Sequence, residues 1–127
     1  WLGQHFLVET GFPLVFVTQY PSVKRPFYAM DDPENPRYTL SYDPPLHGLE
    51  ITTGGQRIHD FEQQAAKMKK RHTDPAAFEN YLTMHKYGLP PHGGFGLGME
   101  RVVEKLLGLE NIREAAAFPR DRNRLQP

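Results

Sequence analysis

The chain has 127 residues, of which 39% are hydrophobic, and this length and composition fit one small globular domain. It contains no cysteine, which excludes disulfides and thiolate metal sites. Fifteen Lys and Arg residues balance fifteen Asp and Glu residues, so the net charge argues against a general polyanion binder and leaves only a local basic patch open.

No membrane span or secretory leader is evident in the sequence. The longest purely apolar stretch, residues 14–17, has four residues, whereas a membrane-spanning helix needs about twenty. The first residue is Trp1 rather than methionine, and no charged and apolar leader follows it. We therefore expect a soluble protein with no membrane partner, and a chain that is a piece of something longer.

The first half of the chain predicts short strands between proline turns. Residues 2–10 are weakly periodic and predict the end of a helix, which Gly11 stops. The β-branched and aromatic run 12–18 predicts a strand buried on both faces. A polar surface turn is predicted at residues 31–36. Three further strands are predicted at residues 26–30, 37–42 and 49–53.

The second half predicts three helices. Residues 58–70 place their apolar side chains on one face, with basic residues in the last turn. Asp74 and Pro75 form an N-cap and N1 pair for a second helix. One face of that helix carries Phe78, Tyr81, Leu82 and His85. A third, amphipathic helix is predicted from about residue 98 to Gly108, and Asn111 caps a last short turn. The fold class expected is α+β, with helices against one face of a sheet.

A carboxylate and a glycine pair mark the first candidate site, in residues 48–57. Glu50 faces away from its apolar strand neighbours, and a carboxylate is costly to bury there unless a cation meets it. Either a magnesium–phosphate group or an arginine could supply the positive charge that meets this carboxylate. Gly54 and Gly55 allow a tight turn or close approach of a ligand, and Arg57 is expected at the start of the next helix. The segment predicts either a ligand site or a plain turn whose glutamate pairs with an arginine.

The second candidate site is the glycine-rich segment 93–98. Its four glycines alternate with Phe95 and Leu97, so another group can lie flat against the strand, and Arg101 follows in the first turn of a helix. The glycine spacing matches neither a Walker A loop nor a dinucleotide fingerprint. Two interpretations stay open, an anion or base site and close packing that merely needs small residues.

Other polar residues predict structure rather than chemistry. His59, His85 and His92 lack metal-ligand spacing, so we interpret them as hydrogen-bonded packing residues. The basic run Lys67 to Arg71 is interpreted as a solvated helix end. No candidate segment places a serine beside a histidine, so a nucleophilic triad is not expected.

Several ordered motifs together resemble the class II aminoacyl-tRNA synthetases. The resemblance to motif 3 and to the C-terminal segment of that family lies in residues 93–101, 106–114 and 118–121. Residues 48–57 and 86–94 resemble the archaeal-type aspartyl members of its aspartate and asparagine branch. The resemblance implies an antiparallel sheet flanked by helices in a cytoplasmic enzyme. Such an enzyme activates L-aspartate with ATP and Mg²⁺, transfers the aminoacyl group to tRNA, and forms a homodimer.

The resemblance also implies roles for individual residues. Glu50 resembles the carboxylate that holds Mg²⁺ against the ATP phosphates, with Thr53 near the metal and the amino acid and Asp43 as a second acidic position. Arg57 resembles the arginine that grips the aspartate side chain. The residues that resemble the ATP-contacting end of motif 3 are Gly98, Met99, Glu100 and Arg101.

Parts of the family pattern are missing from these residues. No counterpart of motif 1, of motif 2 with its α-phosphate arginine, or of the anticodon-binding barrel is found. Residues 1–127 are therefore expected to be the C-terminal portion of a catalytic domain, with little or no activity alone. Two alternatives stay open. One is a paralogue that makes an aminoacyl-adenylate without tRNA, like the related asparagine synthetase, and the other is a non-catalytic interaction fragment.

Overall fold

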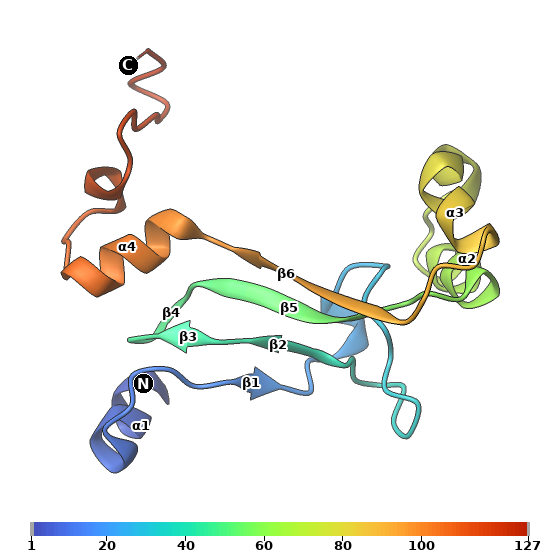
Figure 1. The fold of residues 1–127 in the computed structure, drawn as a ribbon, viewed down its shortest axis with the longest axis horizontal. Coiled ribbons are helices and arrows are strands. Elements are labelled where there is room, and N and C mark those ends of the chain that lie inside the picture. Colours follow the sequence, from blue (N-terminus) through green and yellow to red (C-terminus); the bar gives the residue numbers. More distant parts are fainter. Residues whose placement is uncertain (1, 127) are drawn as a thin grey trace. The chain divides into compact units, whose positions relative to one another are not determined.

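The computed structural model describes residues 2–126, without the side chains at positions 2 and 4, so Trp1 and Pro127 of the predicted domain lie outside the described residues. The helices are α1 (Leu2–Thr10), α2 (Phe61–Lys70), α3 (Glu79–Lys86) and α4 (Met99–Leu107) (Figure 1). Short 3₁₀ turns occupy η1 (Ser22–Lys24), η2 (Pro75–Phe78) and η3 (Ile112–Ala115). The strands are β1 (Val17–Thr18), β2 (Ser41–Asp43), β3 (Pro45–Leu46), β4 (Leu49–Glu50), β5 (Thr52–Arg57) and β6 (His92–Leu97).

The strands form two hydrogen-bonded sets. One set has the order β1-β2-β5-β6 and the other pairs β3 with β4, and the pairs β2–β5 and β3–β4 are antiparallel. This mixture of antiparallel strands and helices confirms the predicted α+β class. Within residues 2–126, no helix combines the length and the apolar character needed to cross a membrane.

The chain divides into two compact units. The first unit consists of Trp1–Val17, Asp43–Thr53 and Gly96–Pro127. The second unit consists of Thr18–Tyr42 and Gly54–Phe95. The buried hydrophobic side chains of the described residues are Ala29, Ile58, Met68 and Leu82, and all four belong to the second unit.

Local capping signals explain the helices of the second unit. Asp60 caps α2 by accepting a hydrogen bond from the Gln63 N–H at 2.8 Å, so the helix begins three residues later than predicted. Arg57 is consequently the last residue of β5 and not the start of a helix, which corrects the prediction. Asp74 caps the next segment as predicted, but its first turn is the 3₁₀ turn η2, before α3 begins.

The predicted strand at residues 26–30 is wrong. The Ala29 N–H donates to the carbonyl of Pro26, which closes a turn, and Ala29 forms only an isolated bridge with Arg57. This turn places the Phe27 side chain in an aromatic cluster. Its ring lies edge-on to Tyr28, Phe78 and Tyr81, with centroid distances of 5.3 to 5.8 Å.

The basic end of α2 is only partly solvated. The side chain of Lys67 is 7% exposed and forms an ion pair with Asp31, which corrects the interpretation of the whole run as a solvated helix end. The packing interpretation of His85 is confirmed, because its ring nitrogens lie 3.2 Å from the carbonyl oxygens of Tyr81 and Ile58. Within residues 2–126, no group of three or more His, Asp or Glu side chains is arranged to hold a metal ion.

The first unit is built from short elements with little buried apolar surface. The β3–β4 turn uses positive backbone φ angles at His47 and Gly48. Helix α4 ends at Gly108 with φ of 64°, as predicted. The predicted strand at 12–18 shortens to β1, and Phe12 and Phe16 are 64% and 59% exposed, so the prediction that both of its faces are buried is wrong.

Candidate functional site

Three of the predicted site residues meet in the first unit. Glu50 ends β4, Thr53 lies in β5 and Arg101 lies in the first turn of α4. The Thr53 hydroxyl donates to Glu50 Oε1 at 3.0 Å, and Arg101 Nη1 donates to the Glu50 carbonyl oxygen at 2.7 Å. Arg101 Nη1 also lies 4.0 Å from Glu50 Oε1. An arginine therefore does meet the glutamate, while about half of each of these two side chains stays exposed and accessible to a ligand.

Two hydrogen bonds fix α4 against the strand segment that carries Glu50. The Gly98 N–H donates to the Ile51 carbonyl at 2.8 Å, and the Thr52 hydroxyl donates to the Gly96 carbonyl at 2.6 Å. A Cβ at position 98 would lie 3.4 Å from the Ile51 carbonyl oxygen, which is an ordinary van der Waals contact. Gly98 is also the N-cap of α4, and it has no side chain to accept from the first turn.

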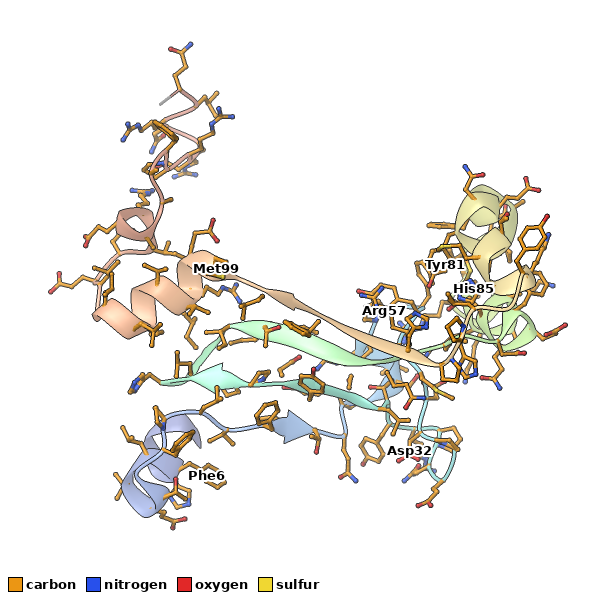
Figure 2. All side chains as sticks on the ribbon, viewed as in Figure 1. Phe6, Asp32, Arg57, Tyr81, His85 and Met99 are labelled. Atoms are coloured by element: carbon orange, nitrogen blue, oxygen red, sulfur yellow. The ribbon has the colours of Figure 1, made fainter. Side chains whose placement is uncertain are left out.

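The first turn of α4 is open to an anion. Met99, labelled in Figure 2 at the start of α4, is 56% exposed, and Glu100 is exposed as well. Amide N–H groups at a helix N-terminus attract negative charge. Met99, Glu100 and Arg101 are therefore exposed in the turn that begins beside Glu50, where the amide N–H groups and Arg101 favour an anion and the Glu100 carboxylate opposes one.

The acidic residues differ in their fitness for a metal ion. The oxygens of Glu50 and Thr53 are hard donors on an exposed surface, which fits Mg²⁺, an ion that uses one or two carboxylates and takes further oxygens from water and phosphate. Asp43, in β2, is only 5% exposed. A bound Mg²⁺ would therefore rely on Glu50 and Thr53 more than on Asp43.

Arg57 is held in the second unit by a ring and a glycine. Its guanidinium carbon lies 4.8 Å from the centroid of the Tyr28 ring. A Cβ at Gly94 would lie 3.0 Å from Arg57 Nε and 3.1 Å from Nη2, so the guanidinium occupies the space that a side chain at position 94 would need. The glycine-rich strand therefore lets another group of the chain approach its backbone closely at Gly94. Among the ion pairs of residues 2–126, none joins Arg57 to a carboxylate.

Aromatic residues around Arg57 were missed by sequence reasoning. Figure 2 shows Tyr81 and His85 on α3 near the end of β5, where Arg57 lies. Burial raises the pKa of the Tyr81 hydroxyl, and the positive charge of Arg57 partly offsets that shift. The sequence places Tyr81 only on one face of its predicted helix, and no spacing in the sequence links Tyr81 or Tyr28 to Arg57.

Close packing explains other glycines of these strands, although not Gly96, where a Cβ would meet nothing within 4 Å. A Cβ at Gly93 would lie 3.1 Å from the Gly55 carbonyl oxygen, and one at Gly54 would lie 2.6 Å from the Tyr42 ring. These contacts support the close-packing interpretation at the glycines concerned, and the interpretation as an anion or base site stays a prediction. Some glycines permit strand contacts, while Gly94 accommodates a guanidinium.

Comparison with known proteins identifies the class. The model of the family described as "tRNA synthetases class II (D, K and N)" matches residues 2–122. Because this match covers nearly the whole chain, the chain belongs to the class II tRNA synthetase family.

Individual relatives narrow the likeness to its aspartate and asparagine members. The chain is 52% identical over 126 residues to the aspartate–tRNA(Asp/Asn) ligase of Thermus thermophilus, which covers 99% of the chain and 29% of the relative. The aspartyl-tRNA synthetase of Entamoeba histolytica matches with a TM-score of 0.94 and 39% identity over 99% of this chain and 26% of that one. The asparaginyl-tRNA synthetase of Pyrococcus horikoshii matches with a TM-score of 0.86 and 40% identity over 95% and 30%. The chain thus spans about 29% of the length of the first curated relative.

Proposed function

We propose that the protein to which this chain belongs is an aspartate–tRNA ligase. The observation that carries this proposal is the guanidinium of Arg57, which is held in place by Tyr28 and Gly94 without a carboxylate partner among the described residues. Such a group is suited to a bidentate, charge-assisted bond with the side-chain carboxylate of aspartate. An asparagine side chain would offer only one acceptor and no charge, so Arg57 favours aspartate. The identity to the Thermus thermophilus ligase supports the same activity.

The residues of the first unit are proposed to bind ATP. Arg101 and the first-turn amides of α4 would contact the nucleotide, with Gly98, Met99 and Glu100 forming the surface on which it lies. Glu50 and Thr53 would hold Mg²⁺ through their oxygens, with Asp43 as a secondary acidic position. When bound, Mg²⁺ neutralises charge on the phosphates.

The proposed reaction needs no protein nucleophile. The α-carboxylate of aspartate attacks the α-phosphate of ATP, and pyrophosphate leaves. A hydroxyl at the 3′ end of tRNA then attacks the carbonyl of the adenylate, and AMP leaves. Because two anions must approach each other, cations and positioning supply most of the catalysis. Arg57 orients the amino acid, and Arg101 opposes charge on the nucleotide.

The wider context is also proposed. Residues 1–127 would form the C-terminal portion of the catalytic domain, and the α-phosphate clamp, the dimer contacts and most tRNA contacts would come from other parts of a homodimeric, cytoplasmic enzyme. We therefore expect the 127-residue chain alone to be inactive or strongly impaired in aminoacylation.

A chimaera tests the proposed function. This chain would replace the matching segment, 29% of the length, of the Thermus thermophilus ligase. We expect aspartate-dependent ATP–pyrophosphate exchange and tRNA charging within about tenfold of the parent ligase, and no exchange by the 127-residue chain alone. A folded chimaera without exchange would contradict the proposal, whereas robust exchange by the chain alone would contradict the need for other parts.

The same chimaera separates the alternatives. Exchange without tRNA charging, while the parent ligase charges tRNA, would indicate the adenylate-forming paralogue. Calorimetric titration of the 127-residue chain with ATP, with and without Mg²⁺, addresses the interaction fragment. A pure interaction module would give no magnesium-dependent heat.

The contact between Gly94 and Arg57 gives a matched pair of variants in one strand. Gly94→Ala in the chimaera places a Cβ about 3.0 Å from the guanidinium and must displace it by a few tenths of an ångström. Because small misplacements of binding groups are costly, we expect the KM for aspartate to rise about tenfold. Gly96→Ala is the control, since a Cβ there meets nothing within 4 Å. Equal effects of the two substitutions on the KM for aspartate would show that Gly94 does not position Arg57.

A further inference from the structure

A basic cavity lies in the second unit, on residues to which the proposed function gives no role. Its volume is about 780 Å³, and it is lined by the segment between Ser22 and Arg37 together with the last turns of α2. Its wall contains one acidic side chain, Asp31, and four basic side chains, Arg37, Lys67, Lys70 and Arg71. This is a local surplus of positive charge in a chain whose net charge is zero.

The acidic side chain of the wall, Asp31, already has partners within the chain. Asp31 Oδ1 lies 2.6 Å from Lys67 Nζ and accepts a second hydrogen bond, also at 2.6 Å, from the Ser22 hydroxyl. Lys67 Nζ donates in addition to the Ala29 carbonyl at 2.6 Å. Asp31 and Lys67 thus neutralise each other, and Asp31 is not available to compensate the other cations.

The remaining three cations have no carboxylate counterion among the described residues. Among the ion pairs of residues 2–126, none joins Arg37, Lys70 or Arg71 to a carboxylate. Arg71 is nevertheless held in place, because its guanidinium donates to the carbonyl oxygens of Ser22 and Val23. Arg37 and Lys70 are exposed at the cavity, and their side chains make no hydrogen bond within the described part of the chain.

The same positive charges affect the pKa of Lys67. Burial lowers its pKa below the usual 10.5, Asp31 raises it in part, and the charges of Arg71 and Lys70 lower it further. These two side chains therefore act on Lys67 as uncompensated positive charges. An anion in the cavity would relieve this repulsion.

We propose that this cavity binds a phosphate group. A fixed guanidinium presents paired N–H donors that match phosphate oxygens, and lysine adds a mobile point charge. Three uncompensated cations match a group that carries up to two negative charges better than they match a single carboxylate. The phosphate has two possible sources, a free phosphate compound or a phosphodiester of an RNA strand, and both place the same chemistry in the cavity.

Amide NMR of the isotopically labelled 127-residue chain tests the proposal. Titration with inorganic phosphate at constant ionic strength, with chloride as the reference anion, should shift amides near residues 22–23, 35–37 and 67–71 and leave those of α4 unchanged. Absence of shifts in these segments, or equal shifts throughout the chain, would overturn the proposal.

A pair of charge reversals on one helix turn sharpens the test. Lys70→Glu should weaken phosphate binding at least tenfold. Lys69→Glu changes the net charge equally, but Lys69 is exposed on α2 and does not line the cavity, so binding should change less than threefold near 0.15 M salt, where screening is strong. Circular dichroism would check that both variants fold. Equal weakening by the two reversals would overturn the proposal, because it would indicate only a diffuse field.

A second arm distinguishes the two sources. The anisotropy of a short, labelled single-stranded RNA is measured with the wild-type chain, and inorganic phosphate is then added as competitor. The source is a polynucleotide if the RNA binds, if phosphate displaces it, and if Lys70→Glu weakens its binding. Phosphate binding without RNA binding identifies a free phosphate compound. Binding of neither probe overturns the proposal.

Discussion

In the chimaera, Arg57→Ala is expected to raise the KM for aspartate by about 30-fold to 4,000-fold while the KM for ATP stays within about threefold. Removing one partner of a desolvated, hydrogen-bonded charge pair costs about 2–5 kcal/mol, and each 1.4 kcal/mol is a factor of ten. The guanidinium lies over the Tyr28 ring and against Gly94, so it is already ordered before aspartate binds. Binding therefore costs less conformational entropy. Steady-state exchange kinetics with each substrate varied in turn measure both constants.

Two further variants define what Arg57 contributes. Arg57→Lys keeps a positive charge but loses the planar fork, so we expect a KM for aspartate between those of the wild type and the alanine variant. Arg122→Ala is the matched control, because Arg122 is exposed and makes no described ion pair. An equal rise in both KM values on Arg57→Ala would mean that Arg57 serves the site generally and not the amino-acid side chain.

Features encoded by neighbouring residues were predictable from the sequence. Asp74, Asn111 and Gly108 mark helix ends because each acts on backbone groups within a few residues, and the structure shows all three in these roles. The pairing of Glu50 with Arg101 could be anticipated only as an alternative, because the two residues are 51 positions apart. The glycine spacing indicated that something would lie flat on the strand, without indicating that it would be Arg57.

Features that depend on distant contacts were not predictable. Lys67 belongs by sequence to a basic helix end, and only its meeting with Asp31, 36 positions away, makes its burial possible. The run 12–18 has the composition of a strand buried on both faces, yet Phe12 and Phe16 are exposed. Composition records how apolar a segment is, whereas burial also depends on which other segments are present to cover it.

Exposed apolar side chains are concentrated in the first unit. Leu106 and Leu107 of α4 are 71% and 70% exposed, and Phe12, Phe16 and Met99 are also exposed. Burial of such side chains is the main favourable contribution to folding, at about 25 cal/mol per Å² of apolar surface. We therefore infer that the packing that stabilises this 127-residue chain lies mainly in the second unit, around the four hydrophobic residues buried there.

Met68→Ala should therefore destabilise the chain strongly. Met68 of α2 is fully buried, at 0% exposure, and a buried Met→Ala substitution removes apolar contacts and leaves a cavity at a cost of about 2–5 kcal/mol. Since a whole domain is stable by only about 5–15 kcal/mol, this loss should lower the urea midpoint of the 127-residue chain markedly.

The matched control for this prediction is Met84→Ala. Met84 lies on α3 and is 52% exposed, so the same change of side chain there should alter the free energy of unfolding by no more than about 0.5 kcal/mol. Hydrogen exchange adds spatial resolution, because loss of Met68 should reduce the protection of amides in α2 and α3 before that of other segments. If the two alanine variants unfold at the same urea concentration, Met68 does not anchor the second unit. The stability of the chain would then have to come from contacts outside the four buried hydrophobic residues.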